Sequence, residues 1–184
     1  AGTDVIVRQN RGVTHLVTRF DMRSGEATWK YEIPNSAVVR PTKDGRLVEL
    51  HLDGQIVFRE QSSGKVVIDV QGEKQSIPGI FYLHETPTEY VVFTATRQRS
   101  FQSRVRPLNL QGSRQDNVEG PAYGIDRRTG KILWTTEIEP QYFAAAQPSA
   151  LPFVVLACQS RKVAPDKGFA VPTRSFPVRV LNTR

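Results

Sequence analysis

The nine residues "DRRTGKILW" at positions 126–134 join an acidic residue, a turn glycine and a tryptophan between two strand-like runs. Nearly the same stretch, "DMRSGEATW", occupies residues 21–29. A looser copy, "EQSSGKVVI", occupies residues 60–68, and "NTR" at residues 182–184 matches the beginning of the motif. A motif that recurs in one chain predicts a repeat architecture in which each copy marks one structural unit.

Each position of the motif has a physical reason. The acidic residue ends a strand and caps backbone N–H groups of the turn. The glycine supplies the positive φ that a tight turn requires. The last residue faces inward on the next strand, where a large ring covers much of a neighbouring sheet. We therefore expect structural roles, not catalytic ones, for the nine motif residues: Asp21, Gly25, Trp29, Glu60, Gly64, Ile68, Asp126, Gly130 and Trp134.

Strand signals dominate the rest of the chain. Runs rich in β-branched and aromatic residues occur at 46–52, 55–60, 65–70, 89–96, 131–138 and 153–158. Asp-Gly pairs at 44–45 and 53–54 are typical of hairpin turns between such runs. The only helical signal is at residues 139–151, where three prolines leave room for about one turn. These patterns predict an all-β chain of short antiparallel strands.

The spacing of the motif glycines indicates how the strands are grouped. Gly25 and Gly64 are 39 residues apart, and Gly130 follows 66 residues later, which an insertion explains. Repeats of about 40 residues with four strands each are typical of β-propeller blades. We predict a propeller segment of about three to four four-stranded antiparallel blades with long loop insertions. Their approximate limits are 1–33, 34–75, 76–140 and an incomplete 141–184.

The repeated D-x-x-T/S-G-x-x-x-W pattern resembles the tryptophan-docking repeat of PQQ-like β-propellers. The stretch "PTKDGRLVELHLDGQIVFREQSSGKVVI" at 41–68 matches the blade layout of that family almost throughout. The resemblance implies one of two kinds of protein. Some members are quinoprotein dehydrogenases that hold pyrroloquinoline quinone and calcium on the propeller axis; others are scaffolds without quinone. Both kinds imply a periplasmic or otherwise extracytoplasmic location.

Cysteine content separates the two kinds. The enzymes of the family usually carry adjacent cysteines joined in a vicinal disulfide, and this chain has only Cys158, which we expect to be a buried thiol. We therefore expect a non-enzymatic scaffold without cofactor. The alternative is a segment of a PQQ-dependent dehydrogenase, or of another enzyme whose active site lies outside these residues. A propeller ring closes with roughly four to eight blades, so we expect a longer chain or another chain to complete it.

Composition restricts the classes of site. The 184 residues are 39% hydrophobic and 23% charged, as in globular proteins, and the longest apolar run, 150–158, is too short to cross a bilayer. Three separate histidines offer no metal-ligand spacing, and His51, flanked by leucines, is expected to face solvent. No nucleophile elbow frames a serine. Glu137 and Glu139 end a predicted strand, where ordinary solvation is sufficient.

Positive charge supplies the strongest functional signal. The net charge is +7, which favours anionic partners. Basic residues gather in two long insertions: Arg97, Arg99, Arg104, Arg106 and Arg114 in the first, and Arg161, Lys162, Lys167 and Arg174 in the second. Both insertions precede the strand that leads into the motif, so we expect them on one face of the ring. They are expected to bind an acidic protein surface, a sulfated glycan or a phosphate group. The alternatives are that they are solvated loops, or that they pack over a neighbouring domain. No aromatic-rich surface accompanies them, so we do not expect nucleic acid.

Overall fold

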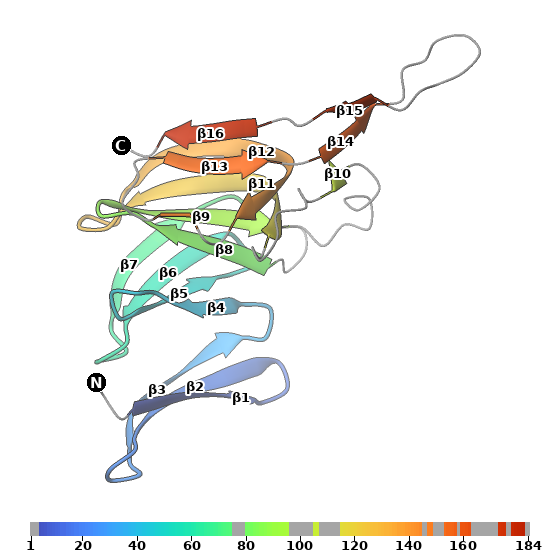
Figure 1. Cartoon of the computed structure of the whole chain (residues 1–184). Coiled ribbons are helices and arrows are strands. Elements are labelled where there is room, and N and C mark those ends of the chain that lie inside the picture. Colours follow the sequence, from blue (N-terminus) through green and yellow to red (C-terminus); the bar gives the residue numbers. More distant parts are fainter. Residues whose placement is uncertain are drawn as a thin grey trace. The chain divides into compact units, whose positions relative to one another are not determined.

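The structure is a computed structural model, and it describes residues 4–74, 80–95, 105–106, 115–144, 147–148, 153–157, 159–162, 173–175 and 178–182. The chain divides into two compact units, residues 1–78 and 79–184. Every regular element in the described residues is a β-strand, and all pairings are antiparallel (Figure 1). The predicted all-β class is confirmed.

The first unit contains two sheets. The first sheet has the order β1-β2-β3, and the second sheet has the order β4-β5-β6-β7 (Figure 1). Their strands are β1 (Asp4–Asn10), β2 (Thr14–Asp21), β3 (Ala27–Pro34), β4 (Val38–Pro41), β5 (Arg46–Leu50), β6 (Gln55–Glu60) and β7 (Val66–Gln71). Gly45 and Gly54 have φ values of 79° and 91°, as the two Asp-Gly turns require. The meander therefore follows the turn signals of the sequence.

The three copies of the motif form one and the same turn. Gly25, Gly64 and Gly130 have φ values of 72°, 71° and 72°. In each copy the glycine N–H donates to the carbonyl of the acidic residue four positions earlier, at 2.7, 2.8 and 2.9 Å. Only glycine adopts this left-handed conformation without a steric cost, which explains why this position does not vary between the copies.

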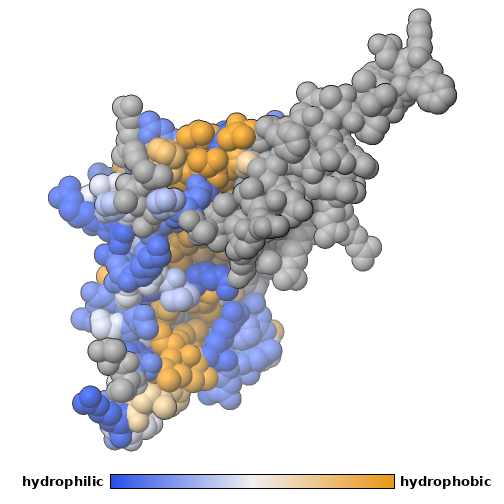
Figure 2. Space-filling view, viewed as in Figure 1, coloured by the Kyte–Doolittle hydropathy of each residue, from blue (hydrophilic) through white to orange (hydrophobic). Residues whose placement is uncertain are grey.

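A hydrophobic core lies between the two sheets of the first unit. Val17 and Ile33 of the first sheet are each only 2% exposed, as is Ala37 just before β4. Partly buried residues surround them: Ile6, Trp29, Tyr31 and Val39. Figure 2 shows hydrophobic residues gathered between these sheets in its lower half. Burial of each large aliphatic side chain contributes about 1.5–3 kcal/mol, so the two sheets hold one another.

The second unit contains a six-stranded sheet and a small three-stranded sheet. The large sheet has the order β16-β13-β12-β11-β9-β8, and the small sheet has the order β10-β14-β15. The strands are β8 (Ile80–Glu85), β9 (Glu89–Ala95), β10 (Val105–Arg106), β11 (Gln115–Asp126), β12 (Ile132–Ala144), β13 (Phe153–Ala157), β14 (Gln159–Lys162), β15 (Thr173–Ser175) and β16 (Val178–Asn182). One hydrophobic cluster joins β9, β11, β12, β13 and β16.

Residues 139–144 correct one expectation, because they continue β12 and form no helical turn. The register between β11 and β12 shifts where Val118 pairs with Gln141 and Gly120 with Ile138. Pro140 therefore lies in an irregularity of the ladder, where the N–H that proline lacks is not needed. The irregularity allows the strand to pass through a proline that the sequence pattern assigns to a turn.

Strand β12 takes part in two groups of strands. Along its whole length it pairs with β11, and at Tyr142 and Phe143 it also pairs with Ala157 and Leu156 of β13. The group β8-β9-β11-β12 has the four antiparallel strands of a blade, and sheets of this kind confirm the predicted partial propeller class. All four predicted blade limits, 1–33, 34–75, 76–140 and 141–184, stay predictions. The described residues contain no helix long and apolar enough to cross a membrane.

Candidate functional site

The small sheet brings the two basic insertions together. Strand β10 lies in the first insertion, and β14 and β15 lie in the second. Arg106 pairs with Gln159, and Arg161 pairs with Arg174. Segments about 55 residues apart in the sequence are thus joined by one backbone ladder. We name β10, β14 and β15 together the basic sheet.

Part of the predicted set lies outside the described residues. These residues are Arg97, Arg99, Arg104, Arg114, Lys167 and Cys158. The structure gives strand positions for the remaining four, which are Arg106, Arg161, Lys162 and Arg174. All four belong to the basic sheet.

The register of the basic sheet places Arg161 and Arg174 at directly opposed backbone positions of neighbouring strands. Arginine is the residue type that forms strong charge-assisted hydrogen bonds with carboxylate, sulfate and phosphate oxygens. Its residue types and strand pairing together make the basic sheet a candidate site for an anionic group.

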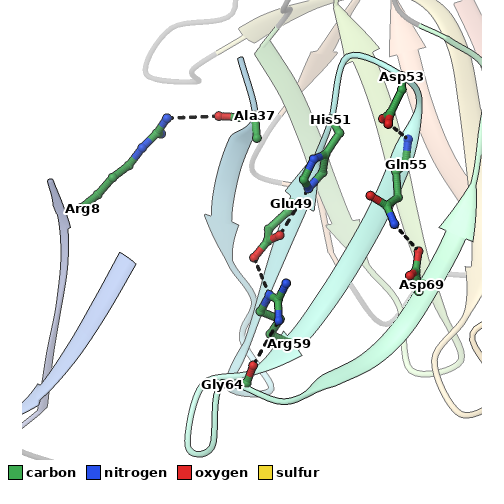
Figure 3. A network of polar contacts seen from close by, with 9 residues as sticks. All are labelled: Arg8, Ala37, Glu49, His51, Asp53, Gln55, Arg59, Gly64 and Asp69. Atoms are coloured by element: carbon green, nitrogen blue, oxygen red, sulfur yellow. Dashed lines mark hydrogen bonds and ion pairs between the residues drawn. The ribbon is translucent and has the colours of Figure 1, made fainter. Parts of the chain in front are cut away.

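A second polar cluster, which the sequence did not reveal, lies in the first unit (Figure 3). Glu49 in β5 is fully buried. Its Oε1 accepts a 2.9 Å bond from Arg59 Nε, and its Oε2 lies 3.3 Å from His51 Nε2. The Arg59 guanidinium also lies 4.1 Å from the centre of the Tyr31 ring of the first sheet. These four residues, which we call the Glu49 cluster, link the two sheets through a buried charge.

The protonation of the Glu49 cluster follows from these contacts. Burial alone would raise the pKa of Glu49, but the contact with His51, the nearby Tyr31 hydroxyl and the charge of Arg59 hold it below its ordinary value. Burial, and then the charge of Glu49, raise the pKa of the Tyr31 hydroxyl. Glu49 is therefore an anion and Tyr31 a neutral phenol at neutral pH. Such a cluster stabilises the contact between the sheets and leaves no reactive base exposed.

His51 corrects another expectation. It does not face solvent freely, because its side chain is only 13% exposed and contacts Glu49. The signal that could have found the cluster is the alternation in "LVELHL", where positions 49 and 51 share one face of the strand. Polar residues on both of these positions predict a polar patch, but the sequence does not show what covers it.

The two tryptophans of the motif lie in different surroundings. Trp29 docks on the neighbouring sheet, where its Nε1 donates to the Gln61 carbonyl at 3.0 Å. Trp134 packs within its own sheet: a Cβ on Gly124 would lie 2.1 Å from its Nε1, which donates to Glu89 Oε2 at 3.0 Å. Burial raises the pKa of Glu89.

The motif acids and the other candidate acids lie in turns or on exposed positions. Asp126 Oδ1 accepts bonds from the N–H groups of Arg128 and Thr129, at 3.0 and 2.6 Å. The hydrogen bond from the Thr129 backbone is the main cause that lowers the pKa of Asp126. Glu137 and Glu139 of β12 are exposed. Among the described residues no three His, Cys, Asp or Glu side chains are grouped as metal ligands. The expectation of no cofactor stays a prediction.

Comparison with known proteins finds weak similarity to solved structures. No family model matches the chain, and no curated protein matches it. Among solved structures, a europium-containing methanol dehydrogenase matches with a TM-score of 0.41 and 16% identity. The match covers 74% of this chain and 23% of that enzyme. At this identity and TM-score the similarity assigns neither an activity nor a cofactor to the chain.

Proposed function

We propose that the chain is a non-enzymatic β-propeller scaffold that binds an anionic partner through the basic sheet. The pairing of β14 with both β10 and β15 carries this proposal, because it unites basic segments that are distant in the sequence. Binding surfaces on a rigid β scaffold are commonly built from its inserted segments. With a net charge of +7, the whole chain also attracts anions before contact. An extracytoplasmic location without a quinone belongs to the same proposal.

Binding to heparin, a sulfated polyanion, tests the proposal. We expect the full chain to be retained on a heparin column and the double variant R161Q/R174Q to elute at clearly lower salt. The matched control is R11Q/R23Q, which removes two exposed arginines from turns of the first unit and the same amount of charge. Because counterion release makes binding fall steeply with salt, the salt concentration at elution reports small losses of affinity. Comparison of the two double variants then separates a local site from a diffuse charge effect.

Two outcomes would contradict the scaffold proposal. Equal loss of retention in both double variants would show that net charge alone binds heparin. Dye-linked alcohol oxidation by the protein supplied with pyrroloquinoline quinone and calcium would show an enzyme instead.

A further inference from the structure

The basic sheet has two faces, and its register assigns each residue to one of them. Successive positions of a strand alternate between the faces, and directly opposed positions of neighbouring strands share a face. Arg161 is directly opposed to Arg174. Gln159 precedes Arg161 by two positions and is opposed to Arg106. Positions 106, 159, 161 and 174 therefore lie on one face, which we call the arginine face.

The opposite face of the basic sheet differs in residue type. It carries Val105, Ser160, Lys162, Thr173 and Ser175, so one of its five positions is basic. Neither face includes an acidic residue. Because the planar guanidinium group forms paired hydrogen bonds with a carboxylate and the lysine ammonium does not, the arginine face is the better match for acidic groups.

Strand β15 (Thr173–Ser175) leaves an edge of the basic sheet open. It is an outer strand in the order β10-β14-β15, and no strand of the described residues pairs with its other side (Figure 1). A sheet edge presents backbone N–H and C=O groups with which a further strand can pair. Extended peptides bind to proteins in this way, and their alternate side chains give specificity. A peptide strand, unlike a polysaccharide, can use this edge and the arginine face together.

We infer that the anionic partner of the basic sheet is an extended acidic segment of another protein, which adds to β15 as a further strand. This inference rests on the proposed function and names the chemistry of the partner. The partner residue opposed to Arg174 shares the arginine face, as do the residues two positions before and after it, so these residues are acidic. The residues between them are opposed to Thr173 and Ser175 and are β-branched, as suits a strand.

The distance of each arginine position from the added strand determines the order of the three contributions. Neighbouring strands lie about 4.8 Å apart. Arg174 is therefore one strand spacing from the added strand, Arg161 two and Arg106 three. Since salt screens charges beyond about 8 Å at physiological ionic strength, we expect Arg174 to contribute most to binding and Arg106 least.

A labelled peptide in which glutamate alternates with valine tests the inference against the full chain. Fluorescence anisotropy at low salt gives its dissociation constant. We expect R174Q to weaken binding about fivefold, R161Q less and R106Q least. K162Q is the matched control for R161Q, because it removes the same charge from the next position of β14 but from the opposite face. We expect K162Q to leave binding unchanged.

Two changes to the peptide test its conformation. A peptide of the same composition with consecutive glutamates is expected to bind more weakly, because a strand then places fewer of them on the arginine face. Successive N–H groups of a strand face its opposite edges. Of two copies methylated on the valine nitrogens or on the glutamate nitrogens, one is therefore expected to lose binding and the other to keep it. Equal behaviour of the methylated copies contradicts strand addition.

Charge reversal separates a loss of charge from a loss of folding. R161E/R174E is expected to release the glutamate peptide and to bind a peptide in which lysine alternates with valine, and this gain requires a folded sheet. The inference is overturned if the reversed variant still prefers the glutamate peptide, if K162Q weakens binding as much as R161Q, or if consecutive glutamates bind as tightly as alternating ones.

The heparin column distinguishes a failure of this inference from a failure of the proposed function. If R161Q/R174Q elutes at lower salt than R11Q/R23Q but the spacing of the glutamates has no effect, the basic sheet binds anions and the acidic strand is wrong. If both double variants lose retention equally, the proposed function itself fails.

Discussion

The indole ring of Trp29 lies against Gly64, and this contact joins the first sheet to the turn of the second. Gly64 meets two demands at once. Its φ of 71° is a conformation that other residues rarely adopt, and a Cβ on it would stand 3.0 Å from the indole. Gly25 has nearly the same φ, 72°, with no ring against it. The pair therefore separates the cost of conformation from the cost of contact.

We predict that G64A destabilises the first unit more than G25A does. Both variants place alanine in the left-handed region, at a cost of roughly 1–2 kcal/mol. G64A also forces the new methyl group against the indole, and overpacking of this kind adds about 1–3 kcal/mol. Free energies of unfolding from urea titration measure both changes. Equal losses in the two variants would show that the indole yields without cost.

The indole N–H is predicted to contribute separately from the ring. W29F keeps an aromatic ring but removes the bond to the Gln61 carbonyl, which is 3.0 Å long. The loss of one such bond costs about 1 kcal/mol in the free energy of unfolding. K30Q is the control, because it changes an exposed side chain of the same strand and leaves Trp29 unchanged. A W29F variant as stable as the wild type would assign the whole contact to packing.

Sequence periodicity is sufficient to locate several strands of this fold. The predicted run at 55–60 is β6 itself, and the predictions at 89–96 and 153–158 differ from β9 and β13 by one residue. Their β-branched residues and Asp-Gly turns are local signals. The extent of β12 is not local, because its passage through Pro140 depends on a register shift in its partner β11. The polar strand β14 also lacks an apolar pattern, and its pairing partners determine it.

The candidate sites, like the strands, combine local signals that the sequence shows with contacts that it does not show. The sequence shows that Arg161 and Arg174 lie in a basic segment, but only the ladder shows that they are directly opposed. The period of two in "LVELHL" places Glu49 on one face of its strand. Its partners Arg59 and Tyr31, however, come from another strand and another sheet. A single sequence does not show which distant segments contact each other, because the local pattern around each residue is the same with or without that contact.

Acid is predicted to weaken the contact that the Glu49 cluster makes between the two sheets of the first unit. The pKa of Glu49 lies below its ordinary value of 4.5 in the folded protein. Its contribution to stability is therefore complete above about pH 4.5 and is lost as the pH falls through the folded-state value. Urea titrations between about pH 7 and pH 3 measure the decline. E49Q is expected to cost roughly 1–3 kcal/mol at pH 7, because Arg59 loses a charged acceptor, and to flatten this decline.

The control for the Glu49 prediction is E26Q. Glu26 is exposed at the end of the turn at residues 21–25, and the same substitution there removes one charge without opening a buried ion pair. We expect the E26Q profile to follow the wild type. An E49Q protein that keeps the full acid decline would mean that other carboxylates cause it.

Ionised Glu89 is predicted to lower the stability of the folded protein, whereas ionised Glu49 raises it. Burial raises its pKa above the ordinary value of 4.5. A raised folded-state pKa gives stability that is present below about pH 4.5 and is lost as the pH rises through the folded-state value. At pH 7 the buried charge therefore costs stability. E89Q removes that charge and keeps an oxygen that can accept the 3.0 Å bond from Trp134 Nε1, so we expect E89Q to be more stable than the wild type at pH 7.

The gain from E89Q should disappear in acid, because wild-type Glu89 is then protonated and resembles glutamine. E139Q, at an exposed position of β12, is the matched control and should change stability little at either pH. A destabilised E89Q at pH 7 would show that Trp134 needs a charged acceptor, since a hydrogen bond to an ionised group is about twice as strong as a neutral one. In that case the bond from Trp134 would outweigh the desolvation of the carboxylate, and the pKa of Glu89 would lie below its ordinary value. The sign of one measured difference thus decides whether burial or the indole N–H controls Glu89.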